Sequence, residues 1–315
     1  MRTAAPAARR RTAAVLLTTL ACVLPLLGGC AGGGGGDRPG VVVTTNILGD
    51  ITRNVVGDEA EVTVLMEAGA DPHSFGVSAP QAARIEQADL VVYNGLGLEE
   101  NVLRHVDAAR EAGTATFAVG DAVDPLAHAS DDTAGQPDPH FWTDPHRVRA
   151  AVDLIAEQVV ENVGGVDAAA VRENADRYGA KVEDLASWMR QRFDGIPEDR
   201  RSLVTNHHVF GYLAQRFGFR VVGAVIPSGT TLASPSASDL ESLATAVREA
   251  EVGAIFADSS RPDRLAQVLR RESGLDVEVV PLFSESLTEE GGGAPTYLDM
   301  MRANTTAIAD GLGTD

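Results

Sequence analysis

The sequence predicts an α/β protein built from two Rossmann-like lobes with parallel sheets, joined by a single long rigid helix. Short β-branched segments alternate with amphipathic helical segments along the 315 residues, a pattern typical of parallel sheets covered on both faces. The alternation restarts after about residue 200, which predicts the second lobe. Between the two series, residues 167–192 contain no proline and one glycine, as expected of a continuous helix.

The N-terminal lobe is predicted to span residues 41–165. Apolar, largely β-branched runs predict its four strands, at 41–45, 62–66, 90–93 and 115–119. Asn46 and Ser78 directly precede segments with helical periodicity and are expected to cap these helices. A further helix is expected around 98–112, and Asp144 is expected to cap the last helix of the lobe.

The linker helix is predicted at residues 166–195. Its apolar side chains recur at spacings of three and four residues from Val171 to Met189, so they form one stripe along a helix of about 40 Å. A core helix within one large domain is the alternative interpretation. The C-terminal lobe is predicted at 196–315, with strands at 203–205, 219–225, 252–257 and 277–282, helices at 207–217, 238–249 and 262–272, and a closing helix from Tyr297.

The N-terminus has the features of a lipoprotein signal peptide, predicted at residues 1–29. Four arginines lie within the first 11 residues. The apolar run that follows, at 13–27, is shorter than the ~20 residues of a membrane span. Small residues precede Cys30 as in a lipobox, so Cys30 is predicted to be lipidated, with a glycine-rich tether at 30–40. An ordinary signal peptide with a chance cysteine, or a twin-arginine signal, is the alternative.

The charge balance excludes two classes of protein. The chain has 26 Lys and Arg against 45 Asp and Glu, a formal net charge of −19. Binding to nucleic acid, or electrostatic docking on an anionic membrane, needs a basic face. Without the signal peptide, Cys30 is the only cysteine, so no intramolecular disulfide is expected. We therefore expect a globular protein outside the membrane, attached to it through its lipid only and with no nucleic-acid partner.

Three imidazoles and a carboxylate are the candidate ligands of a metal ion. His73, His207 and Glu285 each follow a predicted strand, and open parallel sheets bind ligands beyond the carboxyl ends of their strands. His140 lies on a loop that can reach the same place. Neutral imidazoles with a carboxylate suit tetrahedral zinc, whereas manganese prefers more oxygen ligands. Two candidates come from each lobe, so the site is expected between the lobes.

Four segments of the sequence resemble those of a known family. The segments are Asp71-Pro72-His73-Ser74-Phe75, Asp138-Pro139-His140-Phe141-Trp142, Asn206-His207-His208-Val209-Phe210 and Leu282-Phe283-Ser284-Glu285-Ser286. In this order, and together with the lipobox, they resemble the metal-ligand segments of the zinc/manganese solute-binding proteins of ABC importers, the cluster A-I lipoproteins. The resemblance covers nearly the whole mature chain. It departs from the family's pattern at Glu285, where the family often has Asp.

The resemblance implies that the four candidate ligands bind the transported ion. It implies a monomeric, extracytoplasmic solute-binding lipoprotein that delivers its ion to an ABC permease and is not an enzyme. Within the family, three His and one carboxylate usually accompany zinc, so Zn²⁺ is expected and Mn²⁺ is the alternative. Zinc importers often carry a His-rich loop before the second segment. Here His128 is the only histidine in residues 121–139, and we assign it no ligand role.

Three further residues are candidates for supporting the ligand imidazoles. Asn206 and Asp258 are suited to hydrogen-bond an imidazole, although Asp258 is equally suited to cap a helix, and His208 stands beside a candidate ligand. His146 is expected at the surface. A zinc hydrolase is a rival function, since three His with an open position form a catalytic site, but a fourth protein ligand would close it to water. A surface lipoprotein with a structural metal is the third interpretation.

Overall fold

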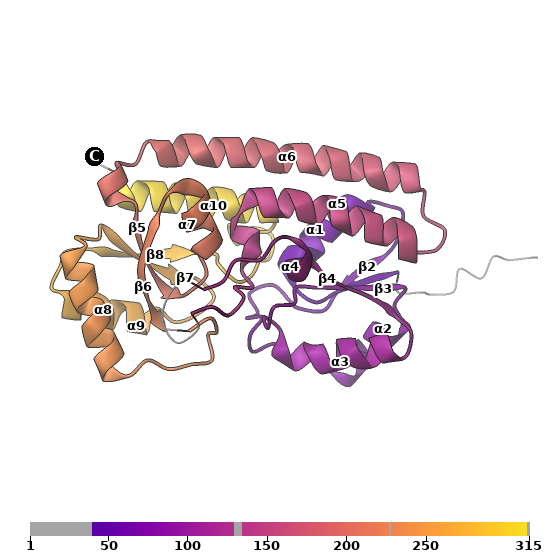
Figure 1. The fold of residues 1–315 in the computed structure, drawn as a ribbon, viewed down its shortest axis with the longest axis horizontal. Coiled ribbons are helices and arrows are strands. Elements are labelled where there is room, and N and C mark those ends of the chain that lie inside the picture. Colours follow the sequence, from indigo (N-terminus) through magenta and orange to yellow (C-terminus); the bar gives the residue numbers. More distant parts are fainter. Residues whose placement is uncertain (1–39, 129–133, 227, 314–315) are drawn as a thin grey trace, which may run out of the picture. The chain divides into compact units, whose positions relative to one another are not determined.

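Parallel sheets in both halves of the chain form the framework of the computed structural model (Figure 1). The structure describes residues 40–128, 134–226 and 228–313, so Cys30 and the glycine-rich tether lie outside the described residues. The described residues belong to one compact unit. None of the helices in these ranges combines the length and the apolar character that crossing a membrane requires. The predicted α/β class with parallel sheets is confirmed.

The N-terminal lobe contains a four-stranded parallel sheet in the order β2-β1-β3-β4. The strands are β1 (Val41–Val43), β2 (Val62–Val64), β3 (Leu90–Tyr93) and β4 (Ala115–Ala118). The helices are α1 (Asn46–Val56), α2 (Ala79–Gln87), α3 (Glu100–Glu111), α4 (Val119–Ala122) and α5 (Pro145–Asn162). Val41 and Val43 face the core that contains α1 and α5, and Val42 faces the core that contains α2 and α3. Both faces of the sheet are therefore covered, as its continuous apolar strands predict.

The C-terminal lobe is built on two pairs of parallel strands. They are β5 (Ser202–His207) with β6 (Arg220–Ile226), and β7 (Ala254–Asp258) with β8 (Glu278–Leu282). The helices are α7 (Gly211–Phe217), α8 (Ala237–Glu249), α9 (Arg264–Ser273) and α10 (Tyr297–Leu312). Val204 packs in the core with α8 and α9, whereas its neighbour Leu203 packs in the core with α7 and α10. Consecutive strand residues thus face opposite layers of helices, as in the first lobe.

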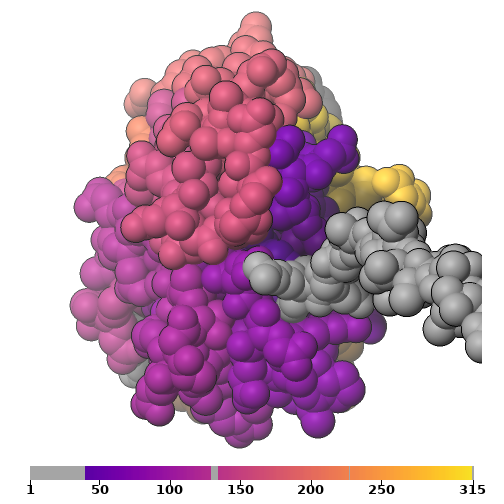
Figure 2. Space-filling view, turned by 90° about the vertical axis from the view of Figure 1, so that its right-hand side faces the viewer, coloured from indigo at the N-terminus to yellow at the C-terminus, as the bar shows by residue number. Residues whose placement is uncertain are grey.

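α6 (Ala168–Asp194) is a single 27-residue helix that runs along both lobes (Figure 1). The predicted stripe from Val171 to Met189 is buried, and α6 packs against α1 and α5 of the first lobe and α10 of the second. Figure 2 shows the pink surface of α6 lying directly on the indigo and purple surface of the N-terminal lobe. The carboxylate of Asp167 caps the helix by accepting from the N–H of Ala169 at 2.8 Å. The long joining helix is confirmed.

Asn46 does not cap α1, contrary to the prediction. Thr45 is the N-cap, and its hydroxyl accepts from the N–H of Leu48 at 3.4 Å. The Asn46 amide reaches the C-terminal lobe instead, where it donates to Ser286 Oγ at 2.7 Å and accepts from the N–H of Leu287 at 3.0 Å. A residue expected to stabilise one helix therefore connects the two lobes.

The boundary between β5 and the helix that follows it also differs from the prediction. The helix expected from residue 207 begins at Gly211, because β5 continues through His207. His207 pairs with Ile226 in the parallel register of β5 and β6. The strand thus includes the polar residues Asn206 and His207, and the His207 side chain lies at the carboxyl edge of the sheet.

Candidate metal centre

His73, His140, His207 and Glu285 lie together, although they come from four separate segments. In the N-terminal lobe, His73 follows β2 and His140 directly precedes the short 3-10 helix η2 (Phe141–Thr143). In the C-terminal lobe, His207 is the last residue of β5 and Glu285 follows β8. No more than 3% of any of the four is exposed to solvent. All four side chains therefore meet in one buried place between the lobes, where the sequence predicts the site.

The potential ligand atoms converge. One such atom from each residue lies within 4.8 Å of the others. The Nε2 atoms of His207, His140 and His73 lie 2.8 Å, 3.5 Å and 3.8 Å from a carboxylate oxygen of Glu285. The three ring centroids are 5.3 to 5.6 Å apart, and the rings are tilted by at least 57° to one another, so no two of them stack face to face.

These converging atoms have no hydrogen-bond partner in the described structure. Nε2 of His73, His140 and His207 and both carboxylate oxygens of Glu285 are buried and unpartnered. Even the 2.8 Å approach of His207 to Glu285 lacks the alignment of a hydrogen bond. An unpartnered buried polar group costs about 1–3 kcal/mol, and a charged one more. Five such atoms in one place have the chemistry of a cation site.

Burial keeps the three imidazoles neutral. It lowers the pKa of His73, holds that of His140 well below its usual range, and lowers that of His207 to about 4. A neutral imidazole carries the lone pair that a metal ion needs. Burial also raises the pKa of Glu285. A divalent cation among these groups would oppose this rise and favour the ionised carboxylate.

An aspartate two residues earlier holds each histidine of the N-terminal lobe. In both Asp-Pro-His segments, the Asp Oδ1 accepts from the backbone N–H of the His, at 2.9 Å from Asp71 to His73 and 3.0 Å from Asp138 to His140. Asp138 Oδ1 also lies 2.7 Å from Nδ1 of His140, which leaves Nε2 to face the site. Neither aspartate is among the predicted supporting residues. The signal that identifies them is the repeated Asp-Pro-His motif.

Two of the predicted supporting residues act in different ways. Asn206 contacts a site imidazole, since its Nδ2 lies 3.2 Å from Nδ1 of His207. Asp258 has no hydrogen bond to an imidazole among the described residues. Its Oδ2 accepts from the N–H and the hydroxyl of Ser284, and it therefore holds the loop that carries Glu285.

His128 and His208 lie beside the site and outside the group of converging atoms. Both are buried, and their ring centroids are 6.4 Å apart. Nδ1 of His128 lies 3.9 Å from Oδ2 of Asp138, the residue that holds His140. The sequence suggests no role for His128. His146, as predicted, is exposed, and it lies near the start of α5.

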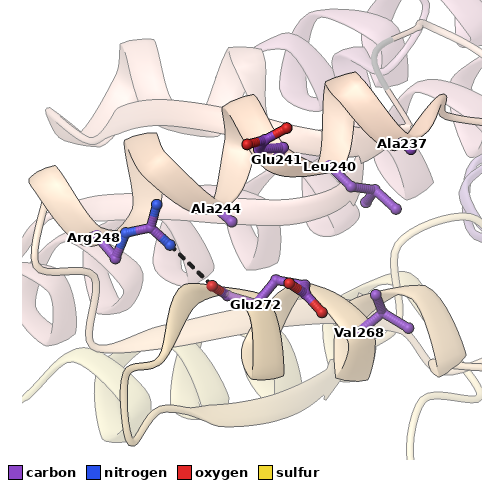
Figure 3. A pocket seen from close by; sticks show the side chains of 7 residues that line it. All are labelled: Ala237, Leu240, Glu241, Ala244, Arg248, Val268 and Glu272. Carbon is purple, nitrogen blue, oxygen red and sulfur yellow. Dashed lines mark hydrogen bonds between the residues drawn. The ribbon is translucent and has the colours of Figure 1, made fainter.

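A separate hollow of about 460 Å³ lies between α8 and α9 (Figure 3). Arg248 crosses one end of it and donates to the backbone oxygen of Glu272 at 2.9 Å. The lining combines alkyl side chains such as Leu240 and Val268 with charged groups. It contains none of the four converging side chains, so it is not the candidate metal centre.

Comparison with known proteins places this site in a wider group. The family described as "Zinc-uptake complex component A periplasmic" matches residues 41–311. The manganese-binding lipoprotein MntA of Halalkalibacterium halodurans is 27% identical over 273 residues, 86% of this chain and 88% of the relative. The iron-binding protein YfeA of Yersinia pestis is 28% identical over 273 residues, 87% and 86% of the two chains. The solved structure of the periplasmic zinc-binding protein TroA of Treponema pallidum matches with a TM-score of 0.81 at 27% identity, over 88% of this chain and 100% of that one.

Proposed function

Because this chain belongs to the ZnuA family, the substrate-binding proteins of metal ABC transporters, we propose that it captures Zn²⁺ outside the membrane and delivers it to an ABC permease. The ion is the transported substrate and not a resident cofactor. In this proposal His73, His140, His207 and Glu285 bind it, two from each lobe. Four protein ligands fill a tetrahedral zinc site and leave no open position for the water of a hydrolase.

The observation that carries the proposal is the group of five unpartnered, buried ligand atoms. In the folded protein these atoms are buried from bulk solvent, and no side chain among the described residues satisfies them. One cation can bind an atom from each of the four side chains at once, which compensates the cost of burying them. Asp138 and Asn206 support this role, since they contact the opposite nitrogens of His140 and His207.

The donor set favours zinc. Three imidazole nitrogens and one carboxylate are typical of four-coordinate Zn²⁺. Manganese is the second candidate, because both oxygens of Glu285 are unpartnered at the site and a bidentate carboxylate would add the oxygen ligand that Mn²⁺ prefers. The names of the relatives support both metals, since MntA is called manganese-binding and TroA zinc-binding.

Anchoring to the membrane is a further part of the proposal. A lipid on Cys30 would hold the protein near the permease. The relative MntA is named a lipoprotein, which supports this arrangement. Mass spectrometry of the membrane fraction tests it, with a diacylated Cys30 as the first residue as the expected result.

Calorimetric titration of metal-free protein tests the proposed binding site. The wild type is expected to bind one equivalent of Zn²⁺. His73→Ala and His207→Ala are each expected to weaken binding by about 100-fold or more, because each removes a side chain that binds the ion directly. His146→Ala is the matched control, since it removes an exposed imidazole and is expected to leave the affinity unchanged. Equal losses in all three variants would contradict the ligand assignment.

Competition between the two ions tests the choice of metal. Zn²⁺ is expected to displace Mn²⁺ from the wild type, and protein purified without added metal is expected to contain zinc by elemental analysis. Retention of Mn²⁺ against equimolar Zn²⁺ would instead support the manganese function.

A further inference from the structure

The two Asp-Pro-His segments differ in what else the carboxylate contacts. In Asp138 the oxygen that holds the backbone of His140, Oδ1, also lies 2.7 Å from Nδ1 of the same residue. In Asp71 the carboxylate points to the other lobe, where Oδ2 accepts from Thr231 Oγ1 at 2.6 Å and pairs with the guanidinium of Arg261. One carboxylate therefore holds the backbone of His73 and contacts two residues of the C-terminal lobe.

The three residues come from separate loops on the two sides of the site. Asp71 lies in the loop after β2, Thr231 in the loop after β6, and Arg261 between β7 and α9. Thr231 is 3% exposed and the side chain of Asp71 10%, whereas that of Arg261 is 37% exposed. The contact thus begins beside His73 and reaches the protein surface.

A hollow of about 410 Å³ lies next to this contact and is lined by residues of the C-terminal lobe. Thr231 and Arg261 line it together with Asn206. They therefore line the same hollow as a residue that contacts His207. Any movement that separates the lobes here must break their contacts with Asp71.

We propose that Asp71, Thr231 and Arg261, which we call the Asp71 clamp, hold the lobes together around the bound ion and set the rate at which it leaves. The inference rests on the proposed function, because it assigns a step of release to the same site. The clamp residues touch no ion. They act by positioning His73 and by closing the lobes, so their loss accelerates release.

The charge of Arg261 offers a different explanation for any effect of its removal. Burial is the main cause that lowers the pKa values of His73 and His207, and the positive charge of Arg261 lowers both further. The same charge would repel a metal cation, so removing it alone would tighten binding. Thr231 separates the two explanations, because Thr231→Val removes a hydroxyl of the clamp without changing any charge.

Stopped-flow release of Zn²⁺ from the full-length loaded protein into excess chelator tests the proposal. Thr231→Val and Arg261→Ala are each expected to release zinc about tenfold faster than the wild type, as expected for the loss of one hydrogen bond to a charged group. Association is expected to change by less than about threefold in Thr231→Val, and Arg261→Lys is expected to restore part of the slow release. Arg270→Ala is the matched control, since Arg270 is exposed in the last turn of α9 and does not line this hollow.

The possible outcomes separate the clamp from its alternatives. Release rates within about twofold of the wild type in both Thr231→Val and Arg261→Ala would overturn the clamp. So would tighter binding in Arg261→Ala with no change in Thr231→Val, because charge alone then explains the effect. Failure of the wild type to bind one equivalent of Zn²⁺ would contradict the proposed function itself. Circular dichroism of each metal-free variant checks its fold, and Thr231→Val, which replaces one hydroxyl by a methyl group, keeps the test valid if Arg261→Ala does not fold.

Discussion

Asp138 determines which nitrogen of His140 faces the metal centre. Its carboxylate contacts Nδ1 at 2.7 Å and also holds the backbone of the same residue, so the ring is fixed in both position and tautomer. Such outer partners orient a ligand and increase its basicity. At the scale of single residues, contacts within the protein therefore orient this candidate ligand.

We expect Asp138→Asn to weaken Zn²⁺ binding by about 10- to 100-fold, because the neutral amide is a poorer acceptor for the imidazole N–H. Chelator competition at neutral pH measures the change. Asp107→Asn is the matched control, since that carboxylate is 57% exposed and pairs only with Arg110 in the salt bridges of the described residues. An unchanged affinity in Asp138→Asn would show that packing alone orients His140.

The four converging residues could be predicted because each carries a local signal. His73, His207 and Glu285 follow predicted strands, and all four lie in motifs that resemble one family. The contact between Asp71 and Thr231 carries no such signal, because the two residues are 160 positions apart and meet through loops of different lobes. Asn46 shows the same limit, since its preference for helix caps is local and its contact with Ser286 is not.

Secondary-structure elements place these residues, and their existence was easier to predict than their ends. The alternation of strands and helices is confirmed in both lobes. The end of β5 was predicted too early, because Asn206 and His207 are polar and periodicity assigns them to a loop or helix. Pairing with β6 keeps them in the strand. This pairing joins residues far apart in the sequence, so periodicity does not predict it. It determines where the His207 side chain lies.

The buried stripe of α6 makes a prediction at the same scale. Leu185→Ala is expected to destabilise the metal-free protein by about 2–5 kcal/mol, because Leu185 is fully buried in the core shared by both lobes and its truncation leaves a cavity. Urea unfolding followed by circular dichroism measures the loss. Lys181→Ala, on the exposed face of the same helix, is expected to change stability by less than about 0.5 kcal/mol. Similar losses in both variants would mean that α6 does not bury this face in solution.

For the whole molecule, the candidate metal centre lies between two lobes that share one hydrophobic core. The main hydrophobic core includes strands of all three sheets and the long helix α6, and contains none of the four converging residues. Each lobe contributes two of the four side chains to the site. In the proposed function, metal binding would add a link across the lobes to a framework that is already packed, which suits a substrate-binding protein that must release its ion and remain folded.

Thermal unfolding with and without zinc tests this view. The metal-free protein is expected to unfold cooperatively, and Zn²⁺ at 100 times its Kd to stabilise the native state by about 2.7 kcal/mol, because the unfolded chain does not assemble the site. This corresponds to an increase in Tm of about 5–10 °C. His207→Ala is expected to lose the zinc-dependent increase while its metal-free form still unfolds cooperatively. If chelation instead unfolds the wild type at room temperature, the ion is a structural element, and delivery to a permease is no longer the explanation of this site.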